Sequence, residues 1–338
     1  MKLYGGIDLH SNNSVVVVLD EQDRVLVEKR VANDLRQIEA LLAAYREQLV
    51  GVVVESTYNW YWLVDGLQAA GYRVHLANTA AIRQYEGLKR TDDVHDAKWL
   101  AHVLRLGILP EGYIYPKEER AVRDLLRKRS QLVRQRTANI LGVQNLVARN
   151  TGAKIAADAV KQLDAEHAVE LGGDELRGRA IEANVVVMRC LDGAIARLER
   201  EVLARVKLRP EFARVRTVPG IGQVLGLTIM LETGTVSRFA KAGRFASYAR
   251  CVDSERISNG KKKGAGNVKC GNRYLAWAFV EAAHFAVRYE PRIKRFYERK
   301  RAKTNAVVAI KAVAHKLARA VWHMLRNEQA FDIGRAFG

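Results

Sequence analysis

The sequence predicts an α/β domain at the N-terminus, a helical, coiled-coil-like middle segment and a mostly α-helical C-terminal domain. Three observations lead to this prediction. Short apolar stretches typical of strands alternate with helical periodicity in the first third of the chain. Long runs with apolar residues three and four positions apart fill the middle. Only 5 prolines occur among 338 residues, which leaves room for long helices. We expect domains at 1–110, 111–205 and 206–338.

The first third contains strand-like and helix-like segments in a defined order. Its strand-like segments are Lys2–Asp8, Ser14–Asp20, Val25–Val31, Val50–Glu55 and Tyr72–Ala77. Its helical segments are Asp34–Gln48, Asn59–Ala70, a segment from about Thr79 and a segment from about Asp93 to Leu106. Three strands come first, and helices then alternate with the remaining strands. This is the order of an RNase H-like domain, in which a mixed sheet carries acidic residues at neighbouring strand ends.

Four acidic residues stand at positions where this fold would bring them together. Asp8 ends the first strand and Glu55 ends the fourth, while Asp93 and Asp96 are three positions apart on one helix and share a face. Converging carboxylates repel one another unless a cation neutralises them. Mg²⁺ and Mn²⁺ prefer oxygen ligands of this kind, and two such ions can assist phosphoryl transfer. The pattern therefore predicts a site for two divalent ions.

Each acid also has an ordinary structural explanation. An Asp at a strand end, like Asp8, is often a turn former. Asp93 and Asp96 fit the first turn of a helix, where acidic side chains are favoured. Asp92 lies beside them and competes for the capping role. The four acids in this order of elements are more specific than any one of them.

The net charge of +19 is concentrated at the C-terminal end of the chain. Residues 206–338 hold 27 Lys and Arg against 9 Asp and Glu, whereas residues 1–115 hold 12 against 15. A nucleic acid is the natural partner of such a region, because binding to phosphates releases condensed counterions. The alternative is a basic protein kept soluble by self-repulsion. A membrane surface fits less well, since the basic residues are not packed on one amphipathic helix.

The sequence predicts a cytoplasmic protein without a membrane partner. No apolar run reaches about 18 residues, and the first residues lack the pattern of a secretory signal. The 3 cysteines, Cys190, Cys251 and Cys270, are far apart and form no zinc-binding pattern. Scattered thiols are typical of a reducing compartment.

The middle of the chain has two long helical patterns. Glu118–Val147 is rich in Arg, Gln and Leu, and Ile181–Val206 has apolar residues at three- and four-residue steps. We interpret them as a helical hairpin or dimerisation segment, with an ordinary helical bundle as the alternative. Thr151–Gly178, between them, is the expected linker.

The C-terminal third contains a turn that resembles a helix-hairpin-helix motif. Pro219–Gly222 separates two apolar helical stretches. Such a turn can present backbone N–H groups at a helix N-terminus to a phosphate, here near Gly220 and Gly222. The alternative is a tight turn between packed helices with no ligand. The last helical segment, about Thr304–Arg326, is expected to complete the core and touch a nucleic-acid backbone.

A Ser, Gly and Lys-rich segment, Ile257–Asn272, precedes a helix that starts near Arg273. Glycines let the backbone approach a phosphate closely, and lysines supply charge. Nucleic-acid contacts are expected from Lys261, Lys262, Lys263, Lys269 and Arg273. The alternative is a mobile basic loop.

Three motifs identify a family resemblance. They are GIDLH at Gly6–His10, VESTYNWYW at Val54–Trp62 and KRTDDVHDAKWLA at Lys89–Ala101. The chain resembles the DEDD insertion-sequence transposase family that includes the Piv-type DNA invertases, from Gly5 to about His323. The resemblance implies a RuvC-like N-terminal domain whose catalytic and metal-binding acids are Asp8, Glu55, Asp93 and Asp96.

The resemblance also implies a serine nucleophile that forms a covalent 5′-phosphoserine link to DNA. The best match is Ser258, although Asn259 intervenes before Gly260 and Arg250–Asp253 replaces a run that often contains Gly and Pro in the family. Ser254 is the alternative nucleophile for that reason. The scheme needs the N- and C-terminal domains to meet, within one chain or across subunits.

The partners that the resemblance implies are the DNA of the element ends and target, a bridge RNA encoded by the element, and further copies of the chain in a dimer or tetramer. Its expected location is a prokaryotic cytoplasm, at the nucleoid. Three rival functions stay open. They are a Piv-like site-specific invertase, a RuvC-like structure-specific nuclease in which Ser258 is dispensable, and a DNA-binding module with a degenerate acidic site in which Asp8 is dispensable too.

Overall fold

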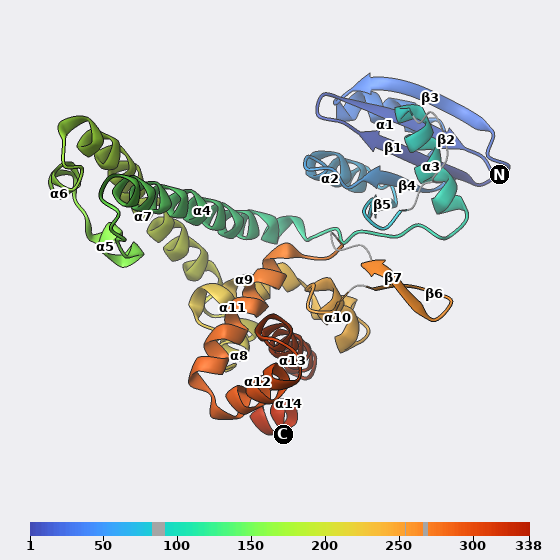
Figure 1. Cartoon of the computed structure of the whole chain (residues 1–338). Helices are drawn as coiled ribbons and strands as arrows, with labels where there is room; N and C mark the ends of the chain where they lie inside the picture. The colour runs from blue at the N-terminus through green and yellow to red at the C-terminus, as the bar shows by residue number, and fades with distance from the viewer. Residues whose placement is uncertain (83–91, 254, 266–269) are drawn as a thin grey trace. The chain divides into compact units, whose positions relative to one another are not determined.

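The computed structural model describes residues 1–82, 92–253, 255–265 and 270–338. The chain forms two compact units, Met1–Lys117 and Glu118–Gly338 (Figure 1). The first unit is a mixed sheet with helices on both faces, and the second is mostly helical. These features confirm the predicted fold class. None of the helices in the described residues is long and apolar enough to span a membrane.

The sheet of the first unit has five strands in the order β3-β2-β1-β4-β5. Their bounds are β1 Leu3–Leu9, β2 Asn13–Leu19, β3 Val25–Ala32, β4 Leu49–Glu55 and β5 Val74–Ala77. The first three strands form an antiparallel meander, and β1, β4 and β5 run parallel. The carboxyl ends of β1, β4 and β5 therefore lie at the same edge of the sheet, which is where strand-borne acids can meet.

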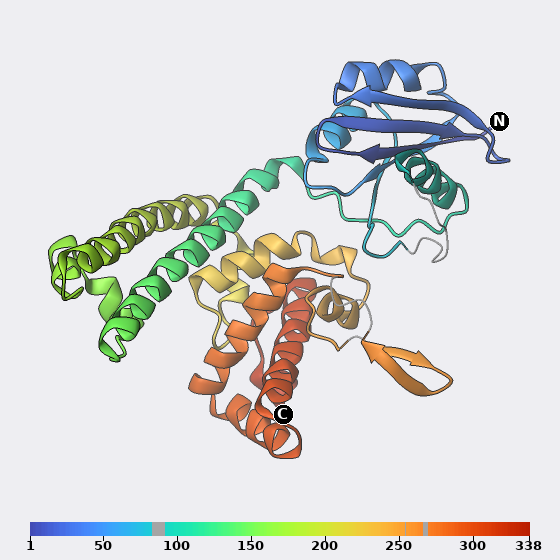
Figure 2. The ribbon, with the colours of Figure 1, turned by 45° about the horizontal axis from the view of Figure 1, so that its top comes forward.

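Two layers of helices cover the sheet. Helices α1 (Leu35–Ala43) and α2 (Tyr61–Ala69) pack on one face, and α3 (Asp93–Arg105) packs on the other. Figure 2 shows α1 and α3 on opposite sides of the strands. Side chains alternate between the faces of a strand, and buried valines of β2 accordingly divide between the two layers.

Helix α3 lies unusually close to β1. A Cβ atom added at Gly6 would lie 2.1 Å from the carbonyl oxygen of Ala97 and 2.8 Å from the amide nitrogen of Ala101. Only glycine fits at this point of β1. The close approach brings the first turn of α3 to the carboxyl end of β1.

The sequence predicted the elements of this unit well, with shifts at their ends. The helix expected at Asp34–Gln48 ends at Ala43 and continues as turns, and the strand expected from Tyr72 begins at Val74. The helix expected from about Thr79 differs: residues 79–81 form a turn. The rest of that predicted helix falls on residues 83–91, outside the described residues.

The second unit begins with a pair of long helices, α4 (Lys117–Thr151) and α7 (Glu175–Val206). Ion pairs join them at two levels, with nitrogen–oxygen distances of 2.7 Å for both Arg129–Glu199 and Arg136–Asp192. The connecting segment, expected as a linker, holds the short helices α5 (Ala157–Gln162) and α6 (Ala165–Glu170). These helices cap the far end of the pair by burying apolar side chains against it.

The remaining helices form one apolar core. They are α8 Pro210–Val215, α9 Gln223–Thr233, α10 Ala242–Tyr248, α11 Arg273–Tyr289, α12 Pro291–Lys303, α13 Ala306–Asn327 and α14 Ile333–Phe337, with a 3-10 turn, η1, at Val236–Arg238. Helices α11 and α13 supply most of its alanine, valine and leucine side chains. The base of α4 and α7 packs against α8 and α9 through a second cluster.

The Ser, Gly and Lys-rich segment, expected as a loop, contains a β-hairpin. Strands β6 (Glu255–Ser258) and β7 (Lys261–Ala265) pair antiparallel. The two-residue turn, Asn259–Gly260, has φ values of 50° and 69°. An Asn-Gly pair with both φ angles positive is the preferred two-residue hairpin turn.

Candidate active site

Asp8 and Glu55 come from neighbouring parallel strands. Ile7 of β1 pairs with Val54 of β4, so the next residue of each strand is an acid at the same edge of the sheet. The preceding residues, Ile7 and Val54, pack their side chains toward α1 and α2. Successive side chains of a strand point to opposite faces of the sheet. Both acids therefore face the α3 side. Asp8 is 3% exposed, and Glu55 is half-buried.

The first turn of α3 supplies the second pair of acids. Asp92 is the N-cap, with its side chain accepting a hydrogen bond of 2.8 Å from the backbone N–H of His95. Asp92 is thus occupied by capping, whereas Asp93 and Asp96 lie in the first helical turn. Asp92 therefore caps the helix, and the two acids predicted for the site, Asp93 and Asp96, do not have that role.

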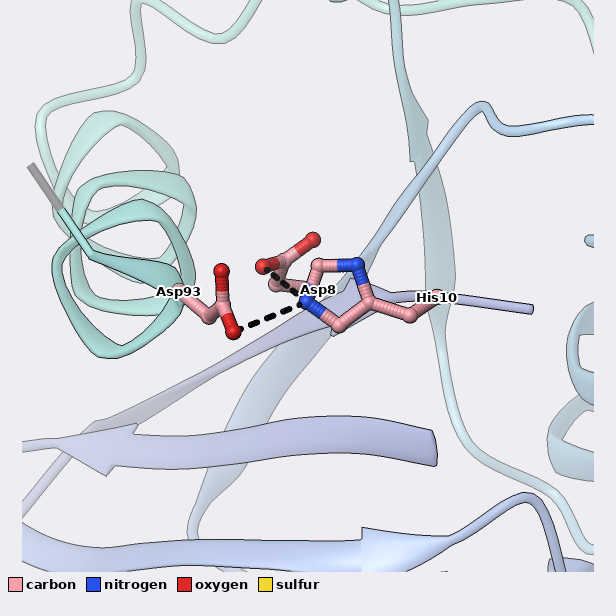
Figure 3. A group of neighbouring side chains, drawn as sticks. All are labelled: Asp8, His10 and Asp93. Carbon is pink, nitrogen blue, oxygen red and sulfur yellow. Dashed lines mark ion pairs between the residues drawn. The ribbon is translucent and has the colours of Figure 1, made fainter. Parts of the chain in front are cut away.

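His10 lies between two of the acids, and sequence reasoning did not select it. Its Nε2 atom is 3.2 Å from Oδ2 of Asp8 and 3.2 Å from Oδ2 of Asp93 (Figure 3). One ligand atom from each of the three residues lies within 4.8 Å of the others. The available signal was spacing: His10 follows Asp8 by two residues, so an extended chain turns both side chains to the same side.

The carboxyl groups interact strongly with one another. Burial of Glu55, a hydrogen bond to Asp8 and the charges of Asp8 and Asp96 raise the pKa of Glu55 to about 8. A hydrogen bond from Arg30, assisted by the nearby imidazole of His10, lowers the pKa of Asp93. Glu55 therefore interacts with Asp8 and with Asp96, and Asp93 is joined to Asp8 through His10. The four predicted acids are thus connected through Glu55 and His10.

The arrangement fits a divalent cation. The Oδ2 atom of Asp8 and the Nε2 atom of His10 are buried, and among the described residues they make ion-pair contacts of 3.2 Å but no hydrogen bond of normal geometry. A buried carboxylate is costly unless a positive charge compensates it. Beside it lies a cavity of about 270 Å³ lined by Glu55, Asp96, Thr79, Ile82, Trp99 and Leu100. Clustered carboxylate oxygens around such a space are typical ligands of Mg²⁺ or Mn²⁺.

Ser258, the predicted nucleophile, is the last residue of β6 and is exposed. It pairs with Lys261 across the two-residue turn. Directly opposed side chains of an antiparallel pair lie on the same face about 5 Å apart at Cβ. The hairpin therefore presents a hydroxyl and an ammonium group together at its tip.

The other basic residues predicted around the hairpin have different positions. Lys263 is exposed on β7, and Arg273 is exposed at the start of α11, where it donates a hydrogen bond to the hydroxyl of Tyr274. Lys262 belongs to β7, although its side chain is not among those described. Lys269 and Ser254 lie outside the described residues.

The two glycines of the helix-hairpin-helix-like turn play different roles. A Cβ atom at Gly220 would lie 2.4 Å from the carbonyl oxygen of Ala282 and 2.6 Å from the nitrogen of Ala286, so Gly220 packs against α11. Gly222 is the exposed N-cap of α9, and no atom lies within 4 Å of a Cβ built there. Packing explains Gly220, whereas Gly222 leaves the start of α9 open to solvent.

Helix α12 is a basic surface that the sequence analysis did not select. Its exposed side chains include Arg292, Lys294, Arg295, Arg299, Lys300, Arg301 and Lys303. None of these seven makes an ion pair with another described residue, and Ile293 is the one buried side chain of the helix. The signal is visible in the sequence as PRIKRFYERKRAK. Its helical character became clear only from its packing against α11 and α13.

Comparison with known proteins identifies the family. Residues 5–149 match the DEDD transposase model of the IS110 type, and residues 213–298 match the model described as "Transposase IS116/IS110/IS902 family". Together the two matches cover more than half of the chain. The first match contains the acidic site, and the second contains the hairpin with Ser258.

Individual relatives agree with this result. The chain is 26% identical over 289 residues to a probable family 20 transposase of Pseudomonas aeruginosa, covering 81% of this chain and 83% of the relative. It is 23% identical over 352 aligned residues to the transposase for insertion sequence element IS1111A of Coxiella burnetii, covering 97% and 91%.

A further match is an insertion element IS900 protein of Mycobacterium paratuberculosis, 28% identical over 193 residues. It covers 54% of this chain and 46% of the relative. The predicted transposase class is confirmed, which disfavours a non-enzymatic DNA-binding module. The chain belongs to the IS110/IS116/IS902 family of transposases, DNA phosphoryl-transfer enzymes with a DEDD domain.

Proposed function

We propose that this transposase moves an insertion sequence by a two-part mechanism, in which Asp8, Glu55, Asp93 and Asp96 hold divalent ions and Ser258 attacks a DNA phosphate. The single observation that carries the proposal is the meeting of carboxylates from β1, β4 and α3 around the buried Asp8, with His10 between Asp8 and Asp93. Like charges at close range oppose one another, so clustered carboxylates favour a bound cation.

The metal-binding role divides among the four acids. Asp8 is buried and fixed by the sheet, so it would be the most constrained ligand. Glu55 and Asp96 line the cavity, and Asp93, which is half-buried, lies against His10. When bound, one or two Mg²⁺ or Mn²⁺ ions would polarise a phosphate oxygen and stabilise charge on the attacking and leaving oxygens.

Ser258 would carry the covalent step. Its Oγ gives up a proton to solvent and forms a bond to phosphorus, while the bond from phosphorus to the 3′ oxygen breaks. That oxygen leaves with the bonding electrons and takes up a proton, giving a free 3′-hydroxyl and a 5′-phosphoserine. Attack by another 3′-hydroxyl reverses the step and joins new strands. Lys261, paired with Ser258, is positioned to stabilise negative charge on the phosphoryl oxygens.

Nucleic-acid contacts would come from several basic elements of the second unit. We assign phosphate contacts to Gly222 at the start of α9, to Lys261, Lys262 and Lys263 of the hairpin, to Arg273 at the start of α11, and to Lys269, which lies outside the described residues. Gly220 would act through the shape of its turn. Helix α12 adds an exposed positive surface suited to a DNA backbone.

The remaining parts of the proposal concern assembly. We propose a three-part organisation (1–110, 111–205 and 206–338) in which the long helices α4 and α7 mediate association into a dimer or tetramer. A bridge RNA from the element would select the DNA sites, because the basic surface suits RNA as well as DNA. The acidic site and Ser258 would act together in the assembled complex.

A recombination assay on supercoiled plasmids carrying the element ends and a target tests the catalytic roles. Asp8→Asn, Glu55→Gln and Ser258→Ala should each abolish product, since each removes a group that takes part in the reaction. Asp92→Asn is the matched control for the acids, because Asn also caps helices and keeps α3 intact. Ser237→Ala, at another exposed serine, is the control for Ser258.

The covalent link is tested separately by denaturing electrophoresis of labelled DNA. Wild type should give a protein–DNA adduct that Ser258→Ala lacks and Ser254→Ala retains. Full recombination by Ser258→Ala would remove the covalent mechanism. Full recombination by Asp8→Asn would remove the metal site. Omission of the element's noncoding RNA should abolish product, and undiminished product would remove the RNA from the proposal.

A further inference from the structure

The imidazole of His10 faces the acidic site from a position where a metal ligand would stand. Its Nε2 atom is 3.2 Å from a carboxylate oxygen of Asp8 and from one of Asp93. Figure 3 shows the ring nitrogen pointing between the two carboxylates. Both Nε2 of His10 and Oδ2 of Asp8 are buried, and neither makes a hydrogen bond of normal geometry in the described part of the chain. The nitrogen and the two carboxylate oxygens therefore converge on one point, as the ligands of a metal ion would.

The backbone of His10 is held in place on both sides. Its N–H donates to the carbonyl oxygen of Asn13 at 2.9 Å. Its carbonyl oxygen accepts hydrogen bonds from the side-chain amides of Asn33 and Asn59, each at 3.0 Å. Asn59 is itself fixed, because its side-chain oxygen accepts a hydrogen bond of 2.8 Å from the hydroxyl of Thr57. These contacts order the residue that follows β1, so the ring position does not depend on a flexible loop.

We propose that His10 is a nitrogen ligand of the metal ion in this site, so that the site prefers a first-row transition ion such as Mn²⁺ over Mg²⁺. The inference rests on the metal site of the proposed function and names a ligand beyond its four acids. Mg²⁺ strongly favours oxygen ligands, whereas imidazole nitrogen suits transition metals. One nitrogen ligand beside the carboxylate oxygens therefore shifts the metal preference toward Mn²⁺ and leaves the four carboxylate ligands in place.

The alternative role for His10 is a charged partner that neutralises Asp8 and Asp93 in place of a cation. In that case its Nε2 would carry a proton, and the ring would move aside when a metal ion binds. The two roles differ in one observable: whether a histidine nitrogen is bonded to the bound ion.

Pulsed electron paramagnetic resonance of Mn²⁺ bound to the full-length protein makes this distinction, because a directly bonded ¹⁴N modulates the electron spin echo. Wild type should show the modulation, and selective ¹⁵N labelling of histidine should change its frequencies. His10→Gln should lose the modulation, while His95→Gln, at a neighbouring histidine of α3, should keep it. Calorimetry should show that His10→Gln lowers the ratio of Mn²⁺ to Mg²⁺ affinity.

Each outcome decides a separate point. Mn²⁺ that binds wild type without ¹⁴N modulation, or modulation that persists in His10→Gln, overturns the His10 assignment and leaves the carboxylate site standing. Failure of wild type to bind either ion overturns the metal site itself. If His10→Gln does not fold, His10→Asn replaces it, and the same loss of the ¹⁴N modulation is expected.

Discussion

The carboxyl group of Glu55 is hydrogen-bonded to that of Asp8, where the parallel strands β1 and β4 end side by side. Two carboxyl groups can share such a bond only if one of them holds a proton. The raised pKa of Glu55, about 8, expresses this competition together with the burial of the residue. A cation that replaces the shared proton would compensate the repulsion between the two ionised carboxylates.

The metal-free protein should therefore lose stability as the pH rises from about 4.5 to about 8. The folded state keeps the proton on Glu55 through this window, whereas the unfolded state, with the ordinary pKa of 4.5, has released it. Since the folded state binds more protons, the free energy of unfolding falls with pH. Thermal unfolding in a chelator at pH 5, 6, 7 and 8 measures the trend, and Glu55→Gln should flatten it.

Mg²⁺ should reverse this loss, because it favours the ionised carboxylates. At 100 times the dissociation constant a ligand stabilises the folded state by about 2.7 kcal/mol. Added Mg²⁺ at pH 7.5 should raise the melting temperature of wild type and Asp92→Asn but not of Asp8→Asn. A pH profile of Glu55→Gln that matches wild type would show that another group titrates.

The hairpin turn should control the covalent step and leave the metal site unchanged. Gly260 has a φ of 69°, which a β-branched side chain disfavours by about 1–2 kcal/mol. Gly260→Val should thus lower the yield of the protein–DNA adduct by roughly tenfold or more. Gly243→Ala, in α10 with open space around it, is the control and should keep full yield. An undiminished adduct with Gly260→Val would mean that turn geometry does not position Ser258.

Helix α12 should contribute to duplex DNA binding through phosphate contacts. Each phosphate contact adds about 0.9 to the slope of log affinity against log salt. Replacing Arg295, Arg299 and Lys303 by Gln should reduce the slope by about 3 and weaken binding to all sequences alike. The same change of charge at the exposed residues Lys2, Arg36 and Arg73 of the first unit should leave the slope unaltered. Equal effects from both triple variants would assign the loss to net charge.

An ion pair should fix the long helices to the core of the second unit. Glu232 on α9 is 3% exposed, and both its oxygens accept hydrogen bonds of 2.7 Å from Arg127 of α4. Asn272 donates a further bond of 2.6 Å. Arg127→Ala leaves a buried carboxylate without its partner and should cost about 3 kcal/mol in the free energy of unfolding. Denaturant unfolding measures it, with Lys128→Ala, on the exposed side of α4, as a neutral control.

The acids of the site could be predicted because their positions depend on local pattern. Asp8 and Glu55 each follow a run of strand-forming residues, and Asp93 and Asp96 begin a helix, so element order alone suggested where they would meet. His10 could not be predicted in this way. Its role depends on the path of the chain after β1 and on how closely α3 approaches at Gly6, and both are tertiary features.

The β-hairpin around Ser258 was expected as a loop, although the sequence contains a local signal for it. Glycine and lysine are poor strand formers, so the composition around Ser258 favoured a loop. The Asn259-Gly260 pair was the local signal for a hairpin. Gly220 also had two explanations in the sequence, and only its contact with α11 showed that packing accounts for it. Local sequence pattern thus indicated where the acids and Ser258 lie, whereas the roles of His10 and Gly220 depend on long-range packing.

The central claim is that the four acids gather around a divalent ion. Anomalous X-ray scattering from crystals of the full-length protein soaked in Mn²⁺ tests it most directly. The account predicts a peak bounded by the carboxylates of Asp8, Glu55, Asp93 and Asp96, absent from Asp8→Asn crystals grown alike. A map with no peak there, while Mn²⁺ occupies other acids of the same crystal, would contradict it.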